Sequence, residues 1–275
     1  MRITLAQINF NPGNLEDHLD RIKEIVGQHA QSDLVVFPEL ILHGHPSQVR
    51  PEGYLYRHMK CLQKDVSLEI YRHVKACQAR VVLGELRRRG DNYYNLATYV
   101  DQNGPQSYAK AHVHWSENFL PGSRLKVFST PVGPLGLTIC YDSAFSEVWR
   151  VLALAGARLV VNISAVPAHF PVAYMRRRMQ GAAVFNQYYV IYVNRPGPVF
   201  AGGSAVYDPH GEELLSMGDR EDVASLEFDP KMVQAWREEE ILFPNRRPLL
   251  YRRVASRNKQ IIDLRGRERL KVVGL

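Results

Sequence analysis

Short, continuous runs of apolar residues alternate along the chain with longer segments whose apolar residues recur every three or four positions. The run 33–37 is apolar after its first residue, rich in β-branched side chains and too short for a helix, which is typical of a strand buried on both faces. Residues 15–29 show helical spacing instead, and Asn14 is placed to cap that helix. The same criteria predict strands at 2–8, 33–37, 79–85, 94–100, 106–109, 135–139, 158–163, 189–194, 203–207 and 222–228, and helices at 15–29, 62–77, 144–156, 171–187 and from Pro230.

This repeated alternation predicts an α/β protein in which helices cover a sheet. No internal repeat or low-complexity linker interrupts it, so we expect one domain at 1–245, with 246–275 as a C-terminal arm of the same domain. A chain of 275 residues, 45% of them hydrophobic, can bury a core without disulfides or metals. It contains no run of about 18 apolar residues and no secretory signal pattern, so we expect a cytoplasmic protein that does not enter a membrane.

Basic charge is concentrated at the C-terminus. Residues 237–275 hold 11 Lys and Arg against 5 Asp and Glu, which leaves the rest of the chain with a net charge of only +1. A basic tail of this kind can bind a polyanion, lie on the surface as a solvated segment, or pair with acidic side chains of a partner subunit. No nucleic-acid recognition motif accompanies it, so we do not expect nucleic-acid binding.

Three reactive side chains follow predicted strands. Glu39 comes after the strand at 33–37, Lys110 after 106–109 and Cys140 after 135–139. Functional groups of open α/β sheets collect beyond the carboxyl ends of strands. There a carboxylate serves as general base, a thiolate as nucleophile and an ammonium as a donor to an oxyanion. Each also has an ordinary structural interpretation, namely a capping carboxylate, a small buried thiol or a solvated lysine, so position alone does not establish an enzyme.

The sequence around these residues carries more information than their positions. The segments are Asp33 to Leu40 with Gly44-His45-Pro46, then Tyr94-Asn95 with Tyr108 to His112, and then Gly136 to Asp142 with Phe145-Ser146-Glu147. Together, and in this order, they resemble the nitrilase, or carbon–nitrogen hydrolase, superfamily. The resemblance extends from residue 2 to Arg246-Arg247-Pro248 and Tyr251.

The resemblance implies a four-layer α-β-β-α sandwich and a Glu39–Lys110–Cys140 triad. Cys140 would attack a carbon–nitrogen bond and form a thioester, with Lys110 and the backbone N–H of Tyr141 receiving the oxyanion. No metal or organic cofactor is required. The family's accessory glutamate has one candidate here, Glu117, four residues before Pro121 and closer to it than the family pattern leads us to expect.

Candidate substrate contacts follow from the same resemblance. Tyr141, Ser164 and His169 are expected to bind the substrate, and Cys61 and Cys77 are expected to be structural. With three cysteines and no Cys/His cluster at ligand spacing, neither a disulfide framework nor a metal site is expected.

The resemblance favours a small amide as substrate and release of ammonia. A nitrile is the alternative, and a weaker likeness to the glutaminase domain of glutamine-dependent NAD synthetases makes a free-standing glutaminase subunit another. A non-catalytic polyanion-binding protein is the remaining possibility. We expect a homodimer or higher homo-oligomer that uses the helices near 144–156 and 171–187 and the C-terminal arm.

Overall fold

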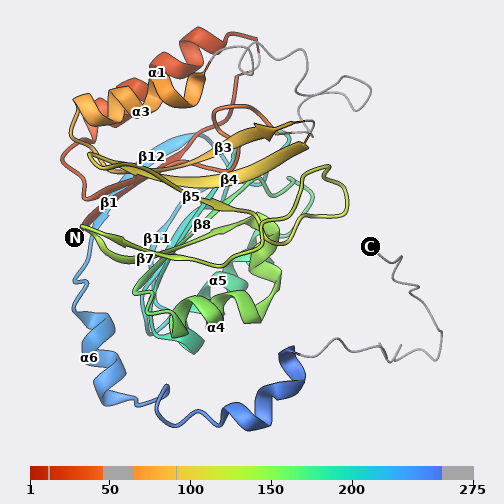
Figure 1. Ribbon diagram of the computed structural model, residues 1–275. Helices are drawn as coiled ribbons and strands as arrows, with labels where there is room; N and C mark the ends of the chain where they lie inside the picture. Colours follow the sequence, from red (N-terminus) through yellow and green to blue (C-terminus); the bar gives the residue numbers. More distant parts are fainter. Residues whose placement is uncertain (12, 46–64, 91, 256–275) are drawn as a thin grey trace. The chain divides into compact units, whose positions relative to one another are not determined.

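The computed structural model describes residues 1–11, 13–45, 65–90 and 92–255 (Figure 1). The expectations for Cys61, for Pro46 and for the first residues of the helix at 62–77 lie outside the described residues. Contacts divide the chain into two units, Met1–Glu239 and Glu240–Leu275. The described part of the second unit ends in a 3₁₀ helix, η3 (Pro248–Ala255), and the guanidinium of Arg246, just before it, lies 5.6 Å from the centre of the Tyr251 ring.

The first unit contains two six-stranded mixed sheets. Their strand orders are β12-β1-β2-β3-β4-β5 and β11-β10-β9-β8-β7-β6. The strands are β1 (Arg2–Gln7), β2 (Leu34–Val36), β3 (Val81–Arg89), β4 (Asn92–Asp101), β5 (Gly104–Ala109), β6 (Val127–Thr130), β7 (Gly133–Ile139), β8 (Leu159–Ser164), β9 (Tyr189–Asn194), β10 (Ala205–Tyr207), β11 (Glu213–Ser216) and β12 (Asp222–Glu227). The central strands of each sheet, β1-β2-β3 and β7-β8-β9, pair in parallel.

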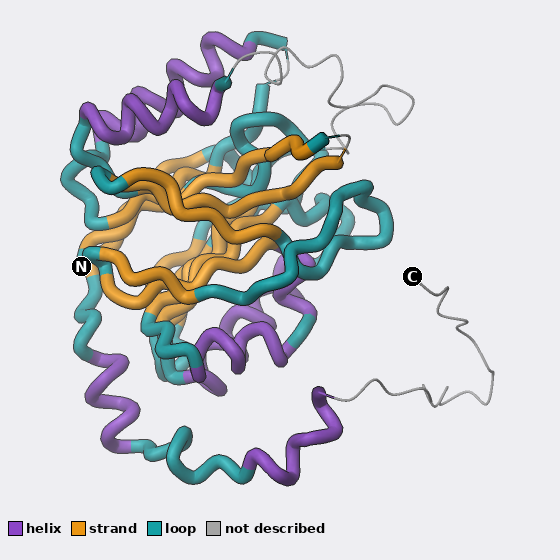
Figure 2. Tube along the Cα trace, viewed as in Figure 1, coloured by secondary structure: helices purple, strands orange, loops and turns teal. Residues whose placement is uncertain are grey.

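Helices cover the outer face of each sheet. Figures 1 and 2 show α1 and α3 against the first sheet and α4 and α5 against the second. The helices are α1 (Leu15–Gln28), α3 (Val66–Ala76), α4 (Ser146–Leu154), α5 (Val172–Asn186) and α6 (Met232–Glu239). The two sheets pack face to face, so the predicted four-layer α-β-β-α sandwich is confirmed.

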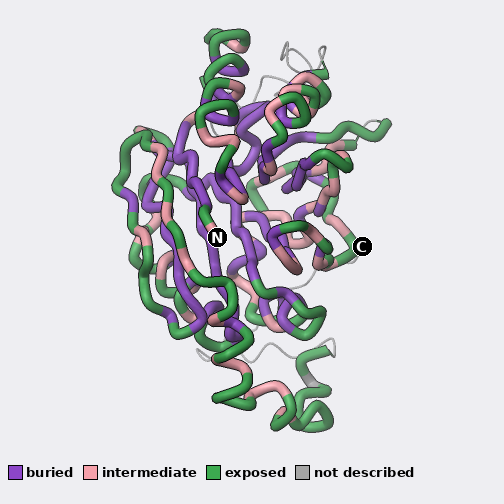
Figure 3. The backbone as a smooth tube through the Cα atoms, turned by 90° about the vertical axis from the view of Figure 1, so that its left-hand side faces the viewer, coloured by how far each residue is buried: buried purple, intermediate pink, exposed green. Residues whose placement is uncertain are grey.

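Strand alternation explains the layers. On β8, Val161 and Ile163 face the core between the sheets, so the intervening Asn162 is on the face that the helices cover. On the first sheet, Val35 packs with the apolar faces of α1 and α3 in a second, outer core. A central strand such as β2 is therefore covered on both faces, and this explains the continuous apolar run seen in the sequence at 33–37. Figure 3 shows burial concentrated in these strands, with exposed residues along the outer helices.

Most predicted elements are present, with shifts at their ends. The Asn14 side chain accepts a hydrogen bond from the Asp17 N–H, so the predicted cap of α1 is confirmed. The prediction missed β6 and β11. Strand β11 is mostly exposed at a sheet edge, so it lacks a recognisable apolar pattern. The helix expected at 144–156 begins only at Ser146, because Cys140–Ala144 forms a 3₁₀ turn, η2. None of the helices within the described residues combines the length and apolar character needed to cross a membrane.

Candidate active site

Glu39, Lys110 and Cys140 lie beyond the ends of β2, β5 and β7, and the fold brings them together in the space between the two sheets. The Lys110 Nζ lies 2.9 Å from the Glu39 Oε1, although 71 residues separate them. Both side chains are almost completely buried. Cys140 is half-buried and packs against the core between the sheets. Glu39 comes from the first sheet and Cys140 from the second, so the site exists only when the sheets are packed together.

Two donors hold the Glu39 carboxylate. Its Oε1 accepts hydrogen bonds from the Lys110 Nζ at 2.9 Å and from the Asn95 Nδ2 at 2.7 Å. After Glu39 the chain turns sharply, with Leu40 in the left-handed region at φ 50°. The turn rests directly on Gly84 of β3, where a Cβ atom would lie 2.2 Å from the Leu40 N. Close packing against a strand therefore fixes the position of the carboxylate.

Lys110 is surrounded by negative charge. Its Nζ donates to the Glu117 Oε1 at 2.9 Å and Oε2 at 2.8 Å in addition to Glu39. Burial alone would lower the pKa of Lys110, but the charges of Glu39 and Glu117, joined by that of Cys140 when it is a thiolate, outweigh it, so the pKa lies above its usual value. Lys110 thus remains an ammonium.

Glu117 lies in the loop between β5 and β6 and is nearly buried. Burial alone would raise the pKa of its carboxyl, but hydrogen bonds from His45 and Lys110 outweigh burial and bring the pKa below its usual value. The His45 Nε2 lies 3.4 Å from the Glu117 Oε1. The sequence analysis singled out Glu117 only as an irregularly spaced candidate, and the structure places it in direct contact with Lys110.

Cys140 occupies the sharp turn between β7 and η2. Its φ of 43° is in the left-handed region, which a residue with a side chain rarely adopts. Burial raises the pKa of the thiol, and Glu39 and Glu117 raise it further, whereas Lys110 and the backbone N–H of Ala165 act in the opposite direction. The resting thiol is therefore protonated, and a base has to remove its proton before it can act as a nucleophile.

Asp142 joins the strand end that carries Lys110 to the turn that carries Cys140. Its Oδ2 accepts from the Ile139 N–H at 3.0 Å and the Tyr108 hydroxyl at 2.8 Å. Its Oδ1 accepts from the His112 N–H at 2.8 Å and lies 3.0 Å from the His112 Nδ1. The motif around Cys140 assigns Asp142 no role, because two of its partners, Tyr108 and His112, come from the other sheet.

The predicted substrate contacts differ in their surroundings. Tyr141 is half-buried, with its ring edge-on to His114 at 4.9 Å. The Ser164 hydroxyl is buried and donates to the Asn162 Oδ1 of the same strand, β8. His169 is exposed in the turn after β8. A substrate-binding role for these three residues stays a prediction.

Glu39, His45 and Glu117 are also the groups that could hold a metal ion, since one ligand atom of each lies within 4.8 Å of the others. The ammonium of Lys110, however, already donates to both carboxylates. A cation bound by the two carboxylates would have to displace this ammonium. The cluster is better described as an ion-pair network built by the chain itself.

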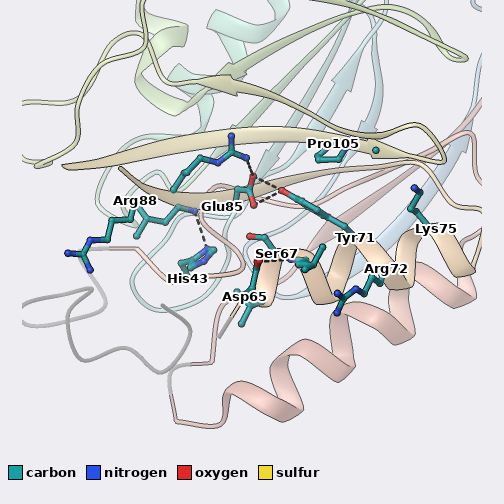
Figure 4. A pocket seen from close by; sticks show the side chains of 14 residues that line it. His43, Asp65, Ser67, Tyr71, Arg72, Lys75, Glu85, Arg88 and Pro105 are labelled. Carbon is teal, nitrogen blue, oxygen red and sulfur yellow. Dashed lines mark hydrogen bonds and ion pairs between the residues drawn. The ribbon is translucent and has the colours of Figure 1, made fainter. Parts of the chain in front are cut away.

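A separate groove of about 800 Å³ lies between α3 and strands β3 and β5 (Figure 4). At its base the buried Glu85 accepts hydrogen bonds from Tyr71 and Thr98. Its lining does not include Glu39, Lys110 or Cys140. Cys77, at the C-terminus of α3, lies on this side of the first sheet, with its Sγ 3.4 Å from the His73 Nε2.

Comparison with known proteins bears directly on this site. The family model described as carbon-nitrogen hydrolase matches residues 2–238. The chain belongs to the carbon–nitrogen hydrolase family. Among the relatives of this hydrolase, an (R)-stereoselective amidase from Pseudomonas sp. is 30% identical over 91% of this chain and 93% of that protein. A nitrilase from Pyrococcus abyssi is 30% identical over 90% of this chain and 99% of that protein.

A glutamine-dependent NAD(+) synthetase from Aquifex aeolicus is 28% identical over 83% of this chain, but the match covers only 42% of that longer protein. Among solved structures, a carbon–nitrogen hydrolase from Helicobacter pylori G27 shares the fold with a TM-score of 0.84 at 21% identity, covering 94% of this chain and 99% of that one. The superfamily predicted from the sequence is therefore confirmed.

Proposed function

We propose that this hydrolase cleaves the carbon–nitrogen bond of a small linear amide, with Cys140 as nucleophile, Glu39 as general base and Lys110 as oxyanion donor. The observation that carries the proposal is the buried contact between the Glu39 Oε1 and the Lys110 Nζ, 2.9 Å long, beside a thiol whose pKa is raised. A protonated thiol next to a buried carboxylate and a fixed ammonium combines the groups that acyl transfer requires.

The reaction begins when the Glu39 carboxylate takes the proton from the Cys140 Sγ. The thiolate attacks the carbonyl carbon, and the resulting oxyanion is received by the Lys110 Nζ and the Tyr141 N–H. Glu39 returns the proton to the leaving nitrogen, the carbon–nitrogen bond breaks, and ammonia leaves behind a thioester. Glu39 then deprotonates water, which attacks the thioester and releases the acid as the Cys140 thiol is restored.

Glu117 supports this cycle through Lys110. Because Glu117 contacts the ammonium with both oxygens, it keeps Lys110 charged and directed toward the site even while the charge on Glu39 changes. A second negative group near Glu39 also makes formation of the thiolate less favourable.

An amide is the first substrate class to test. The relatives include ω-amidases from Bos taurus and Danio rerio and a citrullinase from Francisella tularensis, alongside nitrilases. A nitrile would form a thioimidate and require an additional hydration step, which makes it the alternative. Partial coverage of the NAD synthetases keeps a free-standing glutaminase subunit as a further alternative.

We also propose a homodimer or larger homo-oligomer. The exposed surface of α4 and α5 carries large apolar side chains, among them Leu154 at 48% and Phe185 at 69% exposure. Burial of such a surface against a second copy would remove it from water. Light scattering at micromolar concentration should give at least twice the 31.4 kDa chain mass, and a monomer would contradict the proposal.

The proposed function is tested by ammonia release from matched short carboxamides and nitriles at equal concentration. Cys140→Ala should abolish turnover, whereas Cys77→Ala, on the far side of the first sheet, should stay within a few-fold of the parent. Turnover of nitriles without amides would replace the amidase proposal with the nitrilase alternative. Full activity of Cys140→Ala would show that the nucleophile is assigned incorrectly.

A further inference from the structure

The two oxygens of the Glu39 carboxylate have different surroundings. The Oε1 accepts from both the Asn95 Nδ2 and the Lys110 Nζ. The Oε2 is buried as well, yet none of the described residues donates a hydrogen bond to it. A buried carboxylate oxygen without a donor is uncommon and calls for an explanation. In a general base, that oxygen is the one available to take a proton.

Asn95 accounts for this difference. It lies on β4 with its side chain on the same face as Ala97 and Tyr99, which point into the core between the sheets. Because an ionised carboxylate only accepts hydrogen bonds, the amide must direct its Nδ2 at Glu39. Its Oδ1 is then buried with no partner among the described residues. The Asn95 Nδ2 thus donates to Glu39, and the Asn95 Oδ1 is left without a hydrogen bond as a result.

The backbone of Asn95 reaches the other partner of Glu39. The Asn95 carbonyl accepts the N–H of Lys110 at 2.9 Å, which continues the pairing between β4 and β5 by one residue. A single residue therefore contacts the Glu39 carboxylate through its side chain and the Lys110 main chain through its carbonyl. Neither contact reaches the reacting sulfur, so Asn95 acts through other residues.

We infer that Asn95 is a positioning residue that occupies the Oε1 of Glu39, together with Lys110, and thereby leaves the Oε2 as the proton acceptor. This inference rests on the proposed function, since it assumes that Glu39 serves as the base for Cys140. The titratable groups that face Glu39 from the surrounding elements are Lys110, Glu117, Cys140, Tyr192 and, through Glu117, His45.

The test uses the rate at which iodoacetamide alkylates Cys140 as a function of pH, followed by mass spectrometry of the Cys140 peptide. This measurement requires no knowledge of the natural substrate. Asn95→Asp keeps the shape of the side chain but places an oxygen where the donor was, and Asn95→Ala removes the donor. Thr98→Val is the matched control, because Thr98 lies on the same strand and donates to a different buried carboxylate, that of Glu85.

In both Asn95 variants the acidic limb of the alkylation profile should move to higher pH by about one unit, a loss of about tenfold at a pH on that limb. Asn95→Asp should show the larger shift, because it adds a like charge beside Glu39. At pH values above the limb, both variants should be alkylated at most of the parental rate. A purely structural role would instead reduce the rate equally at every pH, and Thr98→Val should leave the limb in place.

If folded Asn95→Ala and Asn95→Asp show the same pH profile of Cys140 alkylation as the parent protein, the inference is overturned. Loss of cooperative unfolding in both variants would overturn it too, because Asn95 would then be required for folding rather than for the base. Failure of the proposed function looks different, since in that case Cys140→Ala would release ammonia from the carboxamides as fast as the parent protein.

Discussion

Substitution of Gly84 tests how strictly packing sets the position of Glu39, the proposed general base. In Gly84→Ala, the new Cβ would lie 2.2 Å from the Leu40 N, 2.5 Å from the Pro38 O and 2.6 Å from the Glu39 C. All three atoms belong to the backbone, so no side chain can turn away to relieve the contact. The main chain around Glu39 has to retreat from β3 by about 1 Å before contacts of ordinary length return.

Two effects follow from this displacement. Overpacking of this kind costs roughly 1–3 kcal/mol, and with three backbone contacts we expect the upper end, about 3 kcal/mol of unfolding free energy. That corresponds to a fall of about 6–12 °C in melting temperature for a chain of this size. A catalytic group displaced by about 1 Å can lose on the order of 100-fold in rate. Cys140 alkylation near neutral pH should fall accordingly.

Urea denaturation and Cys140 alkylation, measured on the same preparation, check both effects. Gly27→Ala is the control, because the Cβ added there meets nothing within 4 Å in the last turn of α1. It should raise the stability of the protein by no more than about 0.5 kcal/mol and leave alkylation unchanged. If Gly84→Ala retains the parental midpoint and alkylation rate, the reasoning that packing fixes Glu39 is wrong. If stability falls and alkylation does not, the turn tolerates the displacement.

Two further predictions concern buried charge. Asp142→Asn should lose at least tenfold in Cys140 alkylation and about 2 kcal/mol in stability, because one amide oxygen cannot accept from all three donors. The control is Asp208→Asn, at a buried carboxylate after β10 that accepts two backbone N–H groups; it should lose stability only. Equal losses of alkylation in the two variants would contradict the prediction. Burial lowers the pKa of both His18 and His43 from 6.5 to about 4. The unfolded chain therefore binds protons first as the pH falls, so unfolding free energy should drop between pH 6.5 and 4 by up to about 3 kcal/mol per histidine. Urea midpoints across this range should show a flatter profile for His43→Gln, and an identical slope would count against the assignment.

The order of elements is largely determined by the sequence. Strand 33–37 is apolar on both faces after its first residue, and 158–163 is largely apolar, a local pattern typical of burial between two layers that predicts strands near the observed bounds. The Asn14 cap is equally local, since its side chain bonds a backbone N–H three residues away. Edge strand β11 escaped prediction because exposure removes the apolar pattern.

The candidate site likewise combines features that the sequence predicts with features that only the tertiary structure decides. The sequence, through the order of its motifs, singled out Glu39, Lys110 and Cys140, and the carbon–nitrogen hydrolase family is confirmed. The contacts that shape their chemistry involve residues far apart in the chain, such as the 56 positions between Asn95 and Glu39. Such contacts arise only when two sheets pack face to face, because no local pattern records which strand ends will meet. Tertiary structure alone therefore decided which oxygen of Glu39 is occupied and how Asp142 links Lys110 to Cys140.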